Sequence, residues 1–129
     1  MAVDKNIQIL IVDDYKTMLR IIKNLLKQLG FNNVDEATDG SMALEMANKK
    51  EYGLIISDWN MEPMSGLEFL KSVRASSEGN PNVPFIMITA ESKTENVIAA
   101  KEAGVNNYIV KPFNAETLKN KIAAVLGDF

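Results

Sequence analysis

Polar side chains that could do chemistry together stand at the ends of four short, largely apolar runs in this sequence. Residues 9–12 run into Asp13 and Asp14, residues 54–57 into Asp58, residues 85–88 into Thr89, and residues 108–110 into Lys111. If these runs are parallel strands joined by helices, their carboxyl ends share one sheet edge, where such sheets bind ligands. Three carboxylates, a hydroxyl and an amine would meet there. This set predicts a phosphoryl-transfer site.

The three aspartates repel one another unless a cation lies between them. At about 4 Å and an effective dielectric constant near 20, two carboxylates cost roughly 4 kcal/mol before screening. Mg²⁺ suits such a site because it takes one or two carboxylates, some waters and a phosphoryl oxygen. Asp13 and Asp14 alone are better explained as the N-cap of a helix. The metal interpretation is favoured because Asp58 and Lys111 stand at equivalent strand ends.

Asp58 is the candidate nucleophile, because a carboxylate can accept a phosphoryl group to form an acyl phosphate. Lys111 and the metal would neutralise the phosphoryl oxygens, and the Thr89 hydroxyl could hydrogen-bond the attached group. Taken alone, Thr89 is better explained as a strand-end residue, and Lys111 as a solvated lysine. Pro112, however, holds Lys111 in an extended backbone. For Tyr108, an edge aromatic and a functional residue are equally good interpretations.

Helical patterns alternate with the apolar runs and predict five strand–helix units. The expected strands are residues 7–12, 33–37, 53–57, 85–88 and 107–110, the second of them weak and near an edge. Four residues indicate helix starts by N-cap patterns, and two glycines indicate helix ends: Asp39, Ser65, Ser92, Asn114, Gly30 and Gly104. The pattern predicts an α/β fold with helices on both faces of a parallel sheet.

The helix expected between residues 92 and 104 has an unusually thin apolar stripe. It consists mainly of Val97, Ile98 and alanines, whereas the first and last helices offer larger side chains. A thinly anchored helix is less stable locally and easier to shift. Its position is important because it lies between Thr89 and Lys111 along the chain.

Composition excludes several kinds of chemistry. The 129-residue chain has no cysteine and no histidine, which excludes thiol nucleophiles, disulfides and histidine-based triads. Any metal site must be built from oxygen ligands.

Hydrophobic residues at 47% and charged residues at 24% are typical of one soluble domain over residues 1–129. The net charge of −3 gives no reason to bind nucleic acid. With no leader or spanning segment expected, we predict a cytoplasmic protein without membrane contact.

The ordered set Asp13-Asp14, Asp58, Thr89-Ala90 and Lys111-Pro112-Phe113 resembles the receiver domains of two-component response regulators. The resemblance covers the whole chain, and residues 30–34, 58–61, 89–91, 95–100 and 108–113 look like the chemotaxis members of that family. It implies a flavodoxin-like receiver fold, with five parallel strands in the order 2-1-3-4-5 and five helices. It also implies that a chemotaxis histidine kinase donates the phosphoryl group to Asp58.

The resemblance assigns roles around the metal. Asp14, Asp58 and the carbonyl of Asn60 would ligate Mg²⁺ directly, while Asp13 would act through water. Asn60 and Glu91 match positions that tune dephosphorylation. Mg²⁺ is therefore the implied cofactor.

The resemblance also implies how phosphorylation at the site would change the binding of a partner. Thr89 and Tyr108 would form the switch pair, and the Lys111–Pro112 bond would be cis. Tyr108 and Lys121 would belong to a partner surface formed by the fourth helix, fifth strand and fifth helix. That surface would bind the flagellar motor switch protein, with a phosphatase as an optional further partner. We expect a monomer without an appended output domain, so its output would be a binding event.

One loop departs from the family pattern. The usual proline directly after the Met61-type residue is Glu62 here, and Pro63 follows one position later, while Ser65 replaces a common aspartate. These changes bear on the shape of the loop and on its contacts with a kinase or phosphatase.

Other functions remain open. The chain could be a single-domain receiver that acts as a phosphate sink or serves another output. It could be an aspartate-nucleophile phosphohydrolase of the haloacid dehalogenase type, although Asn60 stands where that class needs a second acid. A nucleotide-binding module is disfavoured because no glycine-rich loop follows the first strand.

Overall fold

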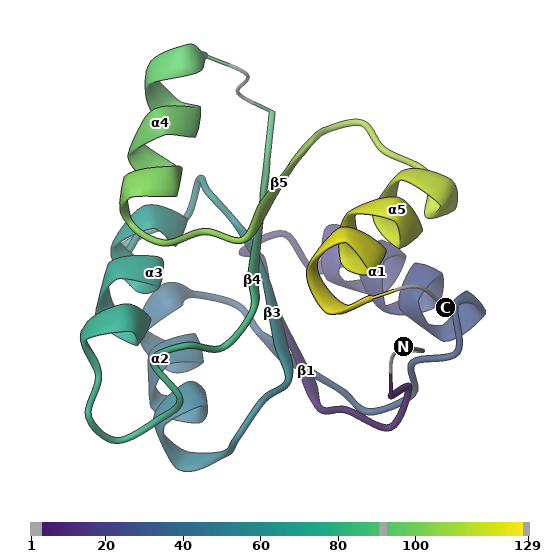
Figure 1. The fold of residues 1–129 in the computed structure, drawn as a ribbon, viewed down its shortest axis with the longest axis horizontal. Helices are drawn as coiled ribbons and strands as arrows, with labels where there is room; N and C mark the ends of the chain where they lie inside the picture. The colour runs from purple at the N-terminus through teal and green to yellow at the C-terminus, as the bar shows by residue number, and fades with distance from the viewer. Residues whose placement is uncertain (1–3, 91–92, 128–129) are drawn as a thin grey trace.

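The structure, a computed structural model, describes residues 4–90 and 93–127. Five parallel strands form one sheet in the order β2-β1-β3-β4-β5, as predicted. The strands are β1 (Ile9–Val12), β2 (Val34–Ala37), β3 (Leu54–Asp58), β4 (Phe85–Thr89) and β5 (Asn107–Val110). The helices are α1 (Lys16–Gln28), α2 (Gly40–Lys49), α3 (Gly66–Ala75), α4 (Thr94–Glu102) and α5 (Ala115–Leu126). Helices α1 and α5 cover one face of the sheet, and α2, α3 and α4 cover the other (Figure 1).

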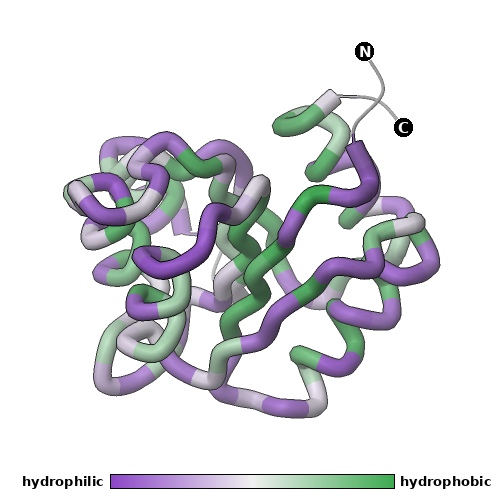
Figure 2. The backbone as a smooth tube through the Cα atoms, turned by 90° about the horizontal axis from the view of Figure 1, so that it is seen from below, coloured by the Kyte–Doolittle hydropathy of each residue, from purple (hydrophilic) through white to green (hydrophobic). Residues whose placement is uncertain are grey.

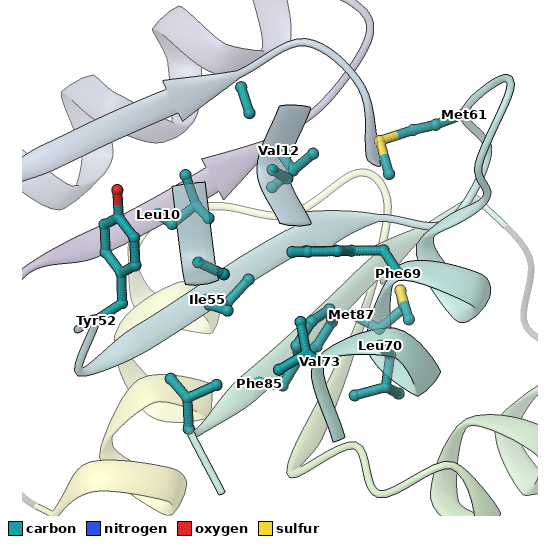
Figure 3. Packing of buried hydrophobic residues seen from close by; sticks show 14 residues of the cluster. Leu10, Val12, Tyr52, Ile55, Met61, Phe69, Leu70, Val73, Phe85 and Met87 are labelled. Carbon is teal, nitrogen blue, oxygen red and sulfur yellow. The ribbon is translucent and has the colours of Figure 1, made fainter. Parts of the chain in front are cut away.

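The central strands are apolar throughout because helices cover both faces of the sheet. Every residue of β1, β3 and β4 is buried, and Figure 2 shows hydrophobic strand segments running through the interior. Alternate strand residues feed two separate cores. Leu10 and Ile55 pack with Phe69 of α3 (Figure 3), whereas Ile9 packs on the other face with Leu118 of α5. This two-sided packing fixes the strand ends relative to one another.

Most of the predicted helix ends are confirmed. Asp39 and Asn114 cap α2 and α5, and each side chain accepts a backbone N–H at 2.8 Å. Ser65 and Glu68 form the predicted capping box at the start of α3. The two glycines predicted to end helices have positive φ angles: Gly30 at 100° and Gly104 at 96°. Such angles favour glycine because it has no Cβ.

Helix α4 begins later than the sequence predicts, but its thin anchorage is confirmed. The predicted cap Ser92 lies outside the described residues, and the helix begins at Thr94. Lys93 occupies the N-cap position without a side-chain capping hydrogen bond. Ala100 is the buried residue of α4, while Ile98 is 49% exposed. Across residues 4–90 and 93–127, no helix combines the length and apolar character needed to span a membrane.

Five strand boundaries differ slightly from the prediction, and two of them are the starts of β2 at Val34 and of β3 at Leu54, each one residue later than predicted. β1 begins at Ile9 rather than at residue 7, and β3 and β4 each extend one residue further, to Asp58 and Thr89. The ladder continues there because the Trp59 N–H donates to the carbonyl of Ile88 at 2.9 Å. Two candidate site residues, Asp58 and Thr89, therefore belong to the strands of the sheet.

Candidate phosphoacceptor and metal site

The chemistry-bearing residues predicted at the strand ends meet at the carboxyl edge of the sheet. Asp13 directly follows β1, and its N–H donates to the carbonyl of Ala37 at 3.2 Å. Asp58 ends β3 and Thr89 ends β4. Lys111 follows β5, and its N–H donates to the Thr89 carbonyl at 2.8 Å. Backbone hydrogen bonds of the sheet thus position the aspartates, the threonine and the lysine.

Asp13, Asp14 and Asp58 form an aspartate cluster. Each offers one carboxylate oxygen, and these oxygens all lie within 4.8 Å of one another. Asp13 and Asp58 are buried, with 1% and 6% exposure, whereas Asp14 is exposed. Asp13 Oδ1 accepts the Tyr15 N–H at 2.9 Å, but the buried Asp13 Oδ2 has no hydrogen-bond partner. Three clustered carboxylates fit a hard divalent cation, and so does a buried carboxylate oxygen without a hydrogen-bond partner.

Lys111 supplies the positive charge of the site. Its Nζ lies 3.0 Å from Asp58 Oδ1 and 3.6 Å from Asp13 Oδ2. Burial raises the pKa of Asp58 above its usual value, although the hydrogen bond from Lys111 acts in the opposite direction. Burial likewise raises the pKa of Asp13, opposed by the Tyr15 N–H. Burial disfavours the charge on Lys111, but its hydrogen bond to Asp58 and the nearby carboxylates raise its pKa overall.

The β3–α3 loop folds back against the end of β3. The Gly66 N–H donates to the Trp59 carbonyl at 2.8 Å, which closes the loop. A Cβ at Gly66 would overlap the carbonyl oxygen of Asp58, so glycine permits this close approach. Asn60 is exposed and, together with Asp14, lines an open hollow of about 380 Å³. The loop therefore holds the backbone of Asn60 beside the aspartate cluster.

The residues predicted to form a switch lie on neighbouring strands. Thr89 is fully buried at the end of β4, and Tyr108 is half-buried in β5. The rings of Tyr108 and Trp59 meet edge to face, with centroids 6.4 Å apart and an interplanar angle of 71°. This contact was not predicted from the sequence. No local pattern predicts it, because Trp59 directly follows β3 whereas Tyr108 lies in β5.

Two further predicted residues lie away from the aspartate cluster or outside the described chain. Lys121 lies on α5, and its backbone carbonyl accepts the Asn107 side-chain N–H at 3.1 Å. Glu91 lies outside the described residues. The Lys111–Pro112 bond is cis, as the resemblance implies, and the Glu62–Pro63 bond, for which no prediction was made, is also cis.

This fold and the arrangement of residues at the carboxyl edge of the sheet match a known protein family. Residues 9–123 match the model of the response regulator receiver domain. The chain therefore belongs to the response regulator receiver family, whose members are signalling proteins. Within that family it is closely related to the CheY-type chemotaxis regulators, as the individual relatives show.

Two sequence relatives are chemotaxis proteins. The chain is 55% identical over 119 residues to chemotaxis protein CheY-3 of Vibrio cholerae, covering 92% of this chain and 91% of that one. It is 50% identical over 118 residues to chemotaxis protein CheY of Pseudomonas aeruginosa, covering 92% and 94%.

Solved structures agree with this assignment. Chemotaxis protein CheY4 of Vibrio cholerae superposes with a TM-score of 0.87 at 37% identity, covering 94% of this chain and 99% of that one. The receiver domain of a sensor histidine kinase from Pseudomonas aeruginosa superposes with a TM-score of 0.84 at 27% identity, covering 95% and 99%. That structure holds a magnesium ion coordinated in its active-site cleft.

Proposed function

We propose that this protein is a phosphorylation-switched chemotaxis response regulator. It accepts a phosphoryl group from a histidine kinase on Asp58 and then binds the flagellar motor switch. One observation carries the proposal: the Asp58 carboxylate lies 3.0 Å from Lys111 Nζ and within an oxygen cluster that can hold a divalent cation. The close relation to chemotaxis proteins of the receiver family supports the motor output.

In the proposed step, an Asp58 oxygen bonds to phosphorus while the bond between phosphorus and the donor histidine nitrogen breaks. The electron pair stays on the imidazole, which takes up a proton, and the product is an acyl phosphate on Asp58. Lys111 lies where it can neutralise the phosphoryl oxygens. Asp14, Asp58 and the Asn60 carbonyl would hold Mg²⁺ directly, with Asp13 acting through water. When bound, Mg²⁺ supplies charge neutralisation for the transferred group.

Phosphorylation would then shift the population of an existing active conformation. Thr89 would move toward the phosphoryl group, and Tyr108 would follow into the vacated space. The thinly anchored α4 would readjust and change the surface that includes Lys121. A ligand can shift this equilibrium only through its different affinities for the two states. Asn60 and Glu91 would set the lifetime of the acyl phosphate, and the protein would act as a cytoplasmic monomer.

Intact-mass measurement tests the phosphoacceptor assignment. We expect acetyl phosphate with Mg²⁺ to add one phosphoryl group to Asp58, detected at acidic pH because an acyl phosphate is labile to base. The Asp58→Asn variant should remain unlabelled, and undiminished labelling of that variant would refute the assignment. Sustained turnover at about 1–1000 per second, as for typical enzymes, would instead support a phosphohydrolase.

A binding experiment tests the motor output separately. We expect beryllofluoride, which mimics a phosphoryl group on a carboxylate, to increase capture of the protein by the flagellar switch. The Asp58→Asn variant serves as the control that cannot respond. Efficient phosphorylation without any beryllofluoride-dependent capture would favour the phosphate-sink alternative.

A further inference from the structure

Glu62 lies at the opening of the site, and the neighbouring residues of the loop restrain its backbone. The preceding Met61 is 5% exposed and packs into the core, whereas Glu62 is exposed. Pro63 follows and restricts Glu62 to extended conformations. After the loop turns, Met64 packs against the core beside α2. With apolar anchors on either side, the carboxylate is directed toward solvent.

The hollow that Glu62 lines is negatively charged. Its six lining residues are Asp14, Trp59, Asn60, Met61, Glu62 and Ser65. Two of these side chains are carboxylates and none is a cation. Lys111 does not line this hollow, because its ammonium group pairs with Asp58 and Asp13. Asp14 belongs both to the hollow and to the aspartate cluster, so the hollow opens directly beside the phosphoacceptor.

We propose that Glu62 is a specificity-determining residue that selects among phosphoryl donors by charge. Its carboxylate disfavours small, strongly anionic donors at Asp58 and strengthens the attraction of the aspartate cluster for Mg²⁺. A protein that carries the donor group can offset the negative charge of Glu62 with groups on its own surface. A free dianion in solution cannot. The proposal rests on the phosphoacceptor function of Asp58, and it gives a role to the residue that replaces the usual proline.

Two small donors of different charge provide the test. At neutral pH acetyl phosphate is more negative than phosphoramidate, and each transfers its phosphoryl group with loss of acetate or ammonia. At low ionic strength and saturating Mg²⁺, we expect Glu62→Gln to speed labelling by acetyl phosphate about two- to four-fold, and labelling by phosphoramidate less. At about 1 M ionic strength, where the Debye length is about 3 Å, the difference should disappear.

Control variants separate charge from shape. Glu62→Asp keeps the charge and should behave like the wild type. Glu51→Gln removes the same charge from an exposed residue before β3, at the opposite end of that strand, and should leave both labelling rates unchanged. Equal acceleration of both donors by Glu62→Gln at either ionic strength would overturn charge selection, as would no acceleration at all.

A second readout does not depend on phosphoryl transfer. Without any donor, Mg²⁺ titration followed by Trp59 fluorescence should give a dissociation constant about two- to four-fold higher in Glu62→Gln at low ionic strength. An unchanged constant would overturn the proposal. If neither donor labels the wild type, the phosphoacceptor function fails. The Mg²⁺ titration then still decides whether the charge of Glu62 acts on the aspartate cluster.

Discussion

Arg74, in the last turn of α3, joins separate segments of the chain and provides the sharpest test of the packing. Its guanidinium donates five hydrogen bonds, 2.7–3.1 Å long, to four oxygen atoms. The acceptors are the carbonyls of Pro81, Val83 and Gly104 and the side-chain oxygen of Asn106. Burial lowers the pKa of Arg74. One side chain thus links α3 to two connections, the one that leads into β4 and the one that leads from α4 to β5.

The Arg74→Met substitution keeps an aliphatic stem and removes all five hydrogen bonds. Arg74 is only half-buried, so water can replace part of what is lost. Counting one hydrogen bond to each of the Val83 and Gly104 carbonyls, at about 1–1.5 kcal/mol each, we expect the free energy of unfolding to fall by about 2–3 kcal/mol. With an m-value of about 1.5–2 kcal/mol/M, the urea midpoint should fall by roughly 1–2 M.

Urea unfolding followed by Trp59 fluorescence measures this change. Lys71→Met, an exposed position on the same helix, is the matched control and should change stability by less than about 0.5 kcal/mol. Arg74→Lys should recover less than half of the loss, because one ammonium group cannot reach four acceptors in the fork geometry of a guanidinium. If Arg74→Met and Lys71→Met destabilise equally, these hydrogen bonds do not stabilise the fold.

Three further substitutions test the site and its surroundings. Asp13→Asn should stabilise the metal-free protein by roughly 0.5–2 kcal/mol in thermal unfolding and weaken Mg²⁺ binding. The reason is that burial raises the pKa of Asp13, so its ionised form disfavours folding at neutral pH. The hydrogen bond from Lys50 lowers the pKa of Asp35. Asp35→Asn should therefore cost up to about 1 kcal/mol at pH 7, and this cost should fade in unfolding measurements below about pH 4. Gly66→Ala should destabilise by about 1–3 kcal/mol in urea and slow phosphoryl labelling of Asp58.

Each of these expectations has a contrary outcome. A less stable metal-free Asp13→Asn protein would mean that the contacts of the Asp13 carboxylate with the Tyr15 N–H and Lys111 stabilise the fold by more than its burial costs. A cost of Asp35→Asn that grows with acidification would contradict the lowered pKa. Wild-type labelling by a destabilised Gly66→Ala variant would separate loop packing from the placement of Asp58.

Local patterns account for what the sequence predicts well. The caps at Asp39, Ser65 and Asn114 depend on residues within three positions, and all of them form. Residues at the carboxyl ends of parallel strands must meet at one edge, so the aspartate cluster and Lys111 could be placed together from strand patterns alone. The strand order came from the family resemblance, because periodicity does not specify which strands are neighbours.

Long-range contacts account for what the sequence could not predict. Arg74 donates to acceptors seven to 32 residues away, and a basic residue in the last turn of a helix ordinarily indicates only a favourable dipole contact. The edge-to-face contact of Trp59 with Tyr108 likewise joins the β3–α3 loop to β5, which is distant in the chain. α4 begins at Thr94, one residue later than a cap at Ser92 would place it, and Ser92 itself lies outside the described residues.

These long-range contacts make α4 asymmetric. Arg74 holds the Gly104 carbonyl just beyond the C-terminal end of the helix. Asn106 also accepts the Phe85 N–H at 2.8 Å, which joins the α4–β5 connection to the start of β4. At the other end, which follows Thr89 and the site, Lys93 makes no side-chain capping bond. If Thr89 moves on phosphorylation, as proposed, we expect the N-terminal end of α4, which is nearer to Thr89 along the chain, to respond before the end that Arg74 holds.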